Sequence, residues 1–151
     1  MACDPCEDRS PVGITLMRMS ILMIAFLLGF APGVRAADEA GSAQAVISSQ
    51  LEAIGRGDAA AAYSYAAPAI QGLFTQPDTF MAMVRQGYAP LVRPKRVEFG
   101  KSAMSDGKIA QHVHIVDSDG VAWEALYTLE QQPDGTLRII GCSLLKADQE
   151  A

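Results

Sequence analysis

The sequence predicts an α+β fold, with N-terminal helices packed on a curved four-stranded antiparallel sheet. Three Asp-Gly pairs, at positions 106–107, 119–120 and 134–135, punctuate the last third of the chain. Each pair lies between runs rich in Val, Ile, Tyr, Trp and Leu, and Gly supplies the positive φ that a tight hairpin turn needs. The preceding part instead has apolar residues at helical spacing. These two patterns predict helices followed by a four-stranded meander.

The N-terminus predicts export. Residues 19–31 form an apolar run, which is followed by a small-x-small cleavage pattern ending at Ala36. The run is shorter than the roughly 20 apolar residues of a membrane-spanning helix, which favours a cleaved signal over an anchor. The segment before Met17 is acidic rather than basic, so Met17 is an alternative start. We expect a signal peptide over 1–36 and a single periplasmic domain over 37–151, with no stable membrane span after cleavage.

The first predicted helix covers residues 42–55, with Ser42 as its N-cap and an apolar stripe along one side. Asp58 is expected to cap a second, alanine-rich helix. This helix ends before Pro68, because the residue before a proline avoids the α region. Residues 70–74 are expected to form a short apolar connector to the next helix.

A third helix is predicted from Pro77 to Gly87. Proline suits the first helical turn, Asp78 favours the positive N-terminal end, and glycine favours the end of the helix. Pro90 and Pro94 then mark the crossing into the sheet.

The register of the sheet follows if each turn is a three-residue loop closed by Gly in the left-handed region. This pairs Met104 with Lys108, Asp117 with Val121, and Gln132 with Thr136. It also places Glu130 opposite Arg138 and Ile115 opposite Trp123, which are favourable cross-strand pairs. The inner face, which the helices are expected to cover, then contains Val97, Phe99, Lys101, Ile109, Gln111, Val113, Ile115, Trp123, Ala125, Tyr127, Leu129, Leu137, Ile139, Gly141 and Ser143. The outer face contains Glu98, His112, His114, Val116, Glu124, Leu126, Thr128, Glu130, Arg138, Ile140, Cys142 and Leu144.

Several strings of the sequence resemble a bacterial family known as domain of unknown function 4864. The most specific is MVRQGY-x-P-x-x-R-P, at residues 83–94, together with the Gly-Cys pair at 141–142. The resemblance covers about residues 43–146 and implies the nuclear-transport-factor-2-like fold, a cystatin-like α+β cone. Because that family is functionally uncharacterised, the resemblance implies no catalytic residue.

A cone fold implies a pocket between the helices and the inner face of the sheet. Enzymes of this fold, such as ketosteroid isomerase, place an Asp or His there for proton transfer. The predicted inner face has neither residue type, which argues against that chemistry, and no cofactor or metal is expected. The alternatives are a pocket for a small apolar ligand and a filled core. The candidate pocket residues are Tyr63, Phe80, Met83, Gln111, Trp123, Tyr127 and Ser143.

The outer face is too apolar for plain solvent exposure and too charged for a core, which predicts partial cover by a second copy of the chain. The candidate interface residues are His114, Leu126, Ile140 and Cys142. His112 and His114 with nearby carboxylates suggest zinc as an alternative to a solvated charge ladder. Cys142 would be the single thiol of the mature chain, since Cys3 and Cys6 precede the signal.

The net charge of the chain limits the kinds of molecule that it is expected to bind. The net charge is −5, and removal of residues 1–36 leaves it unchanged. An acidic exported domain is a poor nucleic-acid binder. Four basic residues at 85–96 either hold an anion or are solvated. The leading prediction is a non-enzymatic binding or protein-interaction module, the first alternative is a small-molecule-binding protein or enzyme, and the second is a structural accessory of an envelope assembly.

Overall fold

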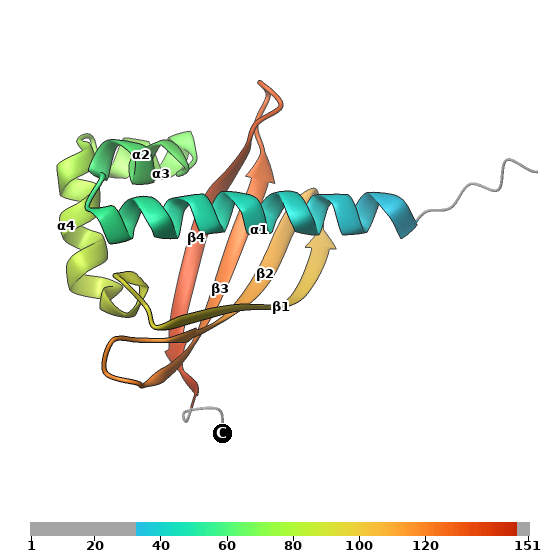
Figure 1. Ribbon diagram of the computed structural model, residues 1–151. Coiled ribbons are helices and arrows are strands. Elements are labelled where there is room, and N and C mark those ends of the chain that lie inside the picture. Colours follow the sequence, from blue (N-terminus) through green and yellow to red (C-terminus); the bar gives the residue numbers. More distant parts are fainter. Residues whose placement is uncertain (1–32, 148–151) are drawn as a thin grey trace, which may run out of the picture. The chain divides into compact units, whose positions relative to one another are not determined.

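A computed structural model describes residues 33–147, which form four α-helices, one 3-10 turn and a four-stranded sheet (Figure 1). The elements, in chain order, are α1 (Gly33–Arg56), α2 (Ala59–Ser64), α3 (Pro68–Leu73), α4 (Pro77–Gly87), η1 (Ala89–Leu91), β1 (Arg96–Ser105), β2 (Lys108–Val116), β3 (Ala122–Gln131) and β4 (Leu137–Lys146). Within this range no helix is long and apolar enough to cross a membrane. Most of the predicted signal segment, with Cys3 and Cys6, lies outside the described residues.

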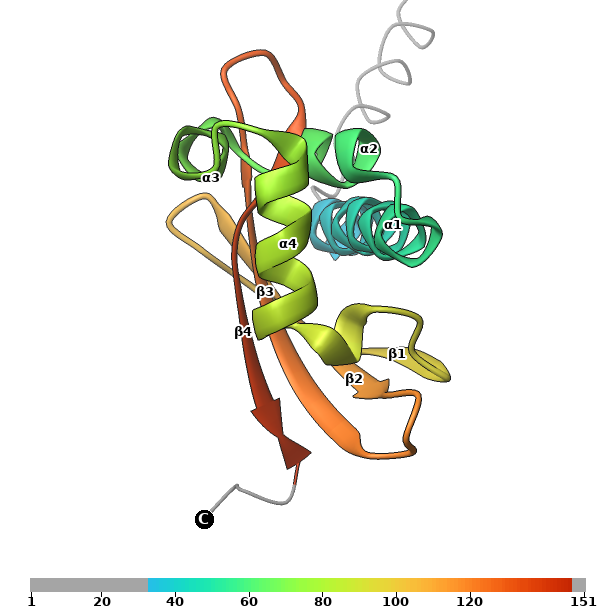
Figure 2. The same cartoon turned by 90° about the vertical axis from the view of Figure 1, so that its left-hand side faces the viewer.

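The predicted α+β architecture is confirmed. The strands lie in the order β1-β2-β3-β4, and every neighbouring pair is antiparallel. Helix α1 crosses the inner face of the sheet, while α2, α3 and α4 gather near its C-terminal end, on the β4 side (Figures 1 and 2). A short parallel bridge joins Ala66 to Ile139, so the segment between α2 and α3 is tied to the edge of β4.

The predictions of the α2 N-cap and of the bounds of α4, which depend on residues near in sequence, were correct. Asp58 accepts a hydrogen bond from the Ala61 amide at 3.0 Å, and α4 has the predicted bounds. Two predictions were wrong. Helix α1 begins at Gly33, so Ser42 is no N-cap and its hydroxyl donates to the Asp38 carbonyl instead. The expected apolar connector is the short helix α3, because Pro68 begins a helical turn as readily as it ends one.

Two of the three hairpin turns have the predicted loop length. The Asp117 amide donates to the Val121 carbonyl at 2.9 Å, and the Gln132 amide donates to the Thr136 carbonyl at 2.8 Å. The first turn is shorter than predicted. Asp106 and Gly107 both have positive φ, at 51° and 73°, and Ser105 rather than Met104 pairs with Lys108. This is the backbone of a two-residue primed turn, which Asp-Gly favours.

Two β-bulges change which side chains share a face. In β1 the irregularity between Phe99 and Ser102 restores the predicted pairs, such as Glu98 with His114, despite the short turn. In β4 the shift opposite Thr128 and Leu129 places Cys142, not Gly141, opposite Tyr127. One extra residue reverses the alternation beyond it. The predicted faces of Cys142, Ser143 and Leu144 were therefore wrong, since Cys142 and Leu144 lie on the inner face and Ser143 on the outer face.

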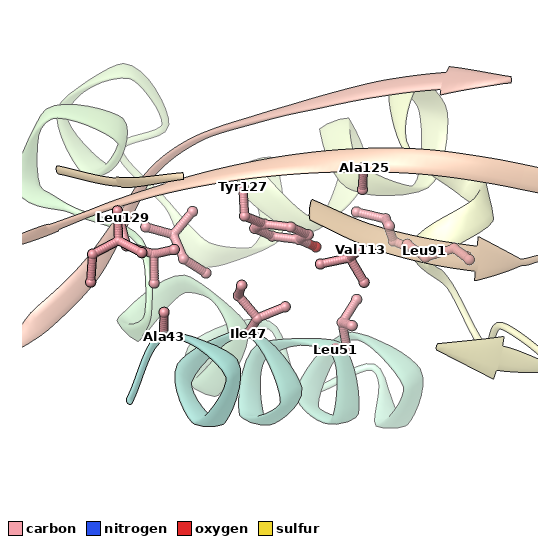
Figure 3. Packing of buried hydrophobic residues seen from close by; sticks show 11 residues of the cluster. Ala43, Ile47, Leu51, Leu91, Val113, Ala125, Tyr127 and Leu129 are labelled. Carbon is pink, nitrogen blue, oxygen red and sulfur yellow. The ribbon is translucent and has the colours of Figure 1, made fainter. Parts of the chain in front are cut away.

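The main core lies between α1 and the inner face. Figure 3 shows Ala43, Ile47 and Leu51 directed from α1 toward the sheet, where they meet side chains from β2 and β3. The i, i+4, i+8 spacing of these three residues aligns them on one helical face. A second cluster joins the C-terminal half of α1 to α2 and α4, and it contains Ala53, Ile54, Ala62, Ala66, Phe80, Met81 and Val84.

Candidate ligand pocket

A pocket of about 280 Å³ lies where the second core cluster meets the sheet. Its walls come from the C-terminal half of α1, from α3, from α4 and the turn after it, and from β3 and β4. None of the lining residues carries a formal charge. They are Gln50, Ile54, Ala66, Ile70, Phe74, Phe80, Met83, Val84, Tyr88, Leu91, Tyr127, Ile139, Ile140, Gly141 and Cys142.

Tyr127 supplies the pocket with a buried polar group that the protein leaves unused. Its side chain is 1 % exposed, and its hydroxyl has no nitrogen or oxygen partner within hydrogen-bond distance among the described residues. Burial is the main reason that the pKa of Tyr127 is raised well above its usual value, and the charge of Cys142, a weak hydrogen-bonding contact with its sulfur and the charge of Tyr88 add to this. The phenol is therefore neutral, and the weak sulfur acceptor is the one competitor for its O–H among the described residues.

Cys142 lies in the same wall, directly opposite Tyr127 in the strand register. Burial raises the pKa of its thiol to about 12, and the hydrogen-bonding contact from the Tyr127 hydroxyl partly opposes this rise. The nucleophilic form of a cysteine is the thiolate, so this thiol is chemically quiet at neutral pH. Its role in the wall is that of a small, polarisable apolar group.

Two other polar side chains of the wall each donate one hydrogen bond within the protein. The Tyr88 hydroxyl donates to the Cys142 carbonyl at 2.9 Å, which fastens the end of α4 to β4. Gln50 is 5 % exposed, and its amide donates to the Ala62 carbonyl at 3.1 Å, which joins α1 to α2. Sequence reasoning missed both residues. A polar residue within the apolar stripe of the first helix was the available signal for Gln50.

Of the predicted pocket residues, Phe80, Met83 and Tyr127 are among those that line this pocket. Tyr63 lies behind the wall. Its ring meets Phe80 edge-on at 5.8 Å, and its hydroxyl donates to the Gln71 and Phe74 carbonyls at 2.9 and 2.6 Å.

The other three predicted pocket residues lie elsewhere. Ser143 is exposed on the outer face. Gln111 is fully buried beneath the β1 bulge, where its amide donates to the Gly100 and His112 carbonyls at 3.0 and 2.9 Å. Trp123 lies near the second hairpin and donates its indole N–H to Asp117 at 2.8 Å. A hollow of about 350 Å³ beside this pair differs from the pocket, because the buried carboxylate there already has its partners.

Two of the predicted interface residues, His114 and Leu126, lie on the outer face, away from α1. Ile140 is the extra residue of the β4 bulge, has no partner in β3, and lines the pocket. On the outer face, the Glu124 carboxylate lies between two imidazoles, with one oxygen 2.8 Å from Nδ1 of His112 and the other 2.5 Å from Nδ1 of His114. Across residues 33–147, no group of three or more Asp, Glu, His or Cys side chains is arranged to hold a metal ion.

Two of the four basic residues at 85–96 make contacts within the protein. Arg93 has a positive φ of 58°, and its Nε donates to the Gly55 carbonyl at 2.9 Å, near the C-terminal end of α1. A cation at that end favourably meets the negative pole of the helix. Arg96 lies 3.7 Å from the carboxylate of Glu98. These contacts account for two of the four residues without an anionic ligand.

Comparison with known proteins agrees with this architecture. The chain resembles a solved structure described as an NTF-2 like protein of unknown function from Silicibacter pomeroyi DSS-3, at 15 % identity and a TM-score of 0.52, covering 73 % of this chain and 97 % of that one. At that identity the similarity concerns the fold alone. No curated protein matches the sequence. A family model described as Domain of unknown function (DUF4864) matches residues 36–151, so the chain belongs to that family.

Proposed function

We propose that this protein is an exported, non-enzymatic domain that binds a small apolar molecule in the pocket between α1, α3, α4 and the sheet. The observation that carries the proposal is the Tyr127 hydroxyl, which is buried in the pocket wall without a partner. Burying a hydroxyl without a hydrogen bond is costly, and such a group in a native fold calls for an explanation. A ligand that accepts its hydrogen bond would supply one.

The lining of the pocket supports binding rather than catalysis. Proton transfer needs a group whose pKa lies near the working pH, and His and carboxylates are the usual ones. The pocket wall has none of these, and the pKa values of Tyr127 and Cys142 are both raised. An apolar wall with one oriented hydroxyl is typical of a site that holds a molecule without changing it.

Native mass spectrometry tests the proposal. The full chain would be expressed with its own N-terminus, and the processed protein would be purified from the periplasm under mild conditions. We expect a bound small mass that disappears in Met83→Trp, because the larger ring fills the pocket from α4. Ala82→Trp is the matched control, since Ala82 is exposed on the same helix. A bare protein, or a mass that Met83→Trp does not displace, would contradict the proposal.

The export part of the proposal has a separate test. The apolar run over 19–31 and the cleavage pattern at Ala36 support it. N-terminal sequencing of the periplasmic protein should begin at Ala37. A protein found only in the cytoplasm with residues 19–31 intact would contradict export without affecting the pocket.

The outer face favours a second candidate function, association with another copy of the chain. Leu126 is half-buried there, and Leu145, which pairs with Glu124, is 60 % exposed. A symmetric dimer through this face would cover both. Light scattering after size-exclusion chromatography should show a dimer that Leu126→Glu converts to a monomer. A monomeric wild-type protein would rule the dimer out.

A further inference from the structure

We infer that the ligand is an uncharged, largely aromatic molecule with one hydrogen-bond acceptor, which the Tyr127 hydroxyl binds. This inference rests on the proposed binding function and names the chemical class that the pocket would select. Three features of the wall carry it: its lack of charge, its aromatic rings and the buried hydroxyl of Tyr127.

The lack of charge excludes ionic ligands. No Asp, Glu, Lys, Arg or His lines the pocket, and its Tyr127 and Cys142 both have raised pKa values. A carboxylate, phosphate or ammonium that entered would lose its hydration and find no opposite charge. The pocket therefore favours neutral molecules over charged molecules of the same shape.

The aromatic rings favour a ring in the ligand. Phe74, Phe80, Tyr88 and Tyr127 all line the pocket, and Phe74 meets Phe80 edge-on with ring centres 6.0 Å apart. Aromatic rings associate through edge-to-face and offset contacts, and the thioether of Met83 also makes favourable contacts with rings. A planar aromatic ligand would use all of these surfaces.

The unused donor defines the polar group of the ligand. The Tyr88 hydroxyl and the Gln50 amide already donate to backbone carbonyls, and the Cys142 thiol points to the Ser143 carbonyl at 3.9 Å. The Tyr127 O–H is left without a nitrogen or oxygen acceptor, and the Cys142 sulfur beside it is a weak acceptor. A carbonyl or ether oxygen on the ligand would be the stronger acceptor for this O–H.

Three compounds that share one ring system test the inference: 1-acetylnaphthalene, 1-ethylnaphthalene and 1-naphthoate. Each would compete with the neutral fluorescent probe N-phenyl-1-naphthylamine for the processed protein. We expect the ketone to bind about three- to tenfold more tightly than the ethyl compound, which is the range of one net hydrogen bond. The carboxylate should bind at least about tenfold more weakly than the ketone, because its charge has no partner.

Variants assign the preference to one hydroxyl. Tyr127→Phe should abolish the preference for the ketone and leave binding of the ethyl compound unchanged. Tyr65→Phe is the matched control, since Tyr65 is half-buried outside the pocket lining, and it should retain the preference. If a variant fails to fold, the preference can still be measured in the wild-type protein, from the affinity of the ketone relative to that of the ethyl compound.

The failures of the two proposals are distinguishable. If 1-naphthoate binds as tightly as the ketone, or if Tyr127→Phe keeps the preference, the ligand class is wrong while binding in the pocket stands. If none of the naphthalenes binds but native mass spectrometry finds a mass that Met83→Trp displaces, the class is again wrong. If that mass is absent as well, the binding function itself fails.

Discussion

Asp117 and Tyr127 are both buried polar residues of the second hairpin, but they differ in how fully their polar groups are hydrogen-bonded. Asp117 is 8 % exposed, and its carboxylate accepts from the Trp123 indole at 2.8 Å and from the Asp119 and Val121 amides at 2.9 Å each. These bonds, that of the Trp123 indole first, hold its pKa below the ordinary value of 3.8. Tyr127 is 1 % exposed, and its hydroxyl has no nitrogen or oxygen partner in the described structure, only the weakly accepting Cys142 sulfur nearby.

The difference separates a structural site from a candidate binding site. A buried polar group that is fully hydrogen-bonded rigidifies its surroundings, whereas an unpaired one is a cost that the fold must offset elsewhere. The turn at Asp117 is complete without any other molecule. The middle of β3, beside α4, has a pocket and an unused donor at the same place.

Removal of the complete network should have the largest effect. Asp117→Ala leaves the Trp123 indole N–H and two turn amides without their acceptor, and the melting temperature should fall by roughly 10 °C. Asp134→Ala is the control, because Asp134 is also a turn aspartate whose carboxylate accepts from the Thr136 amide and hydroxyl, at 2.9 and 2.6 Å, but it is exposed. Thermal unfolding followed by circular dichroism would compare them. Equal losses would show that the buried indole contact adds nothing.

Gln111 has both a hydrogen-bonded and an unpaired buried group in one side chain. Its amide nitrogen donates hydrogen bonds, and its Oε1 is buried without a partner. Gln111→Leu should lower the melting temperature by about 6 °C, because the carbonyls of the β1 bulge lose their donor. Gln132→Leu, at a residue of the third turn whose side chain donates only to Glu130, is the control. An unchanged melting temperature would mean that the bulge does not depend on the glutamine.

Two tyrosines in the same pocket wall sharpen the comparison further. Tyr88→Phe removes the bond to the Cys142 carbonyl and should cost about 1 kcal/mol of unfolding free energy. Tyr127→Phe removes a hydroxyl with no partner and should cost nothing or slightly stabilise the protein. Urea denaturation of the ligand-free variants measures both. A clear loss in Tyr127→Phe would reveal a hydrogen bond to this hydroxyl and weaken the case for an open donor.

The sequence was sufficient where the signal is local. Asp-Gly pairs predicted the hairpins, Asp58 the cap of α2, and Pro77 with Gly87 the bounds of α4. The side chains of β2 and β3 fell on their predicted faces, because neither strand contains an irregularity that reverses the alternation of its own residues.

The bulges account for most of what was missed. Gly100 and Gly141 are the two glycines inside described strands, and each lies at a bulge, which is a known meaning of an isolated strand glycine. Reading Gly141 in that way would have placed Cys142 in the pocket wall. The rest of the pocket lining could not be predicted, because it depends on α3 and on the long-range bond between Tyr88 and β4.

The smallest effect we predict is an acid dependence of the melting temperature that comes from Asp117 and not from Tyr127. Because the folded-state pKa of Asp117 is below its ordinary value of 3.8, its ionised form stabilises the fold fully above that value, and this contribution is lost as the pH falls through the folded-state pKa. The melting temperature of the wild-type protein should therefore fall as the pH drops below about 4. Asp117→Asn should show a shallower fall, and the remainder includes Asp134, whose pKa is also lowered, chiefly by the Thr136 hydroxyl. Tyr127→Phe should leave the acid profile unchanged, since its phenol is neutral throughout that range. An identical acid profile in Asp117→Asn and wild type would mean that the hairpin network does not depend on the charge of the carboxylate. Asp117 and Tyr127 would then differ only in the number of hydrogen bonds that each side chain makes.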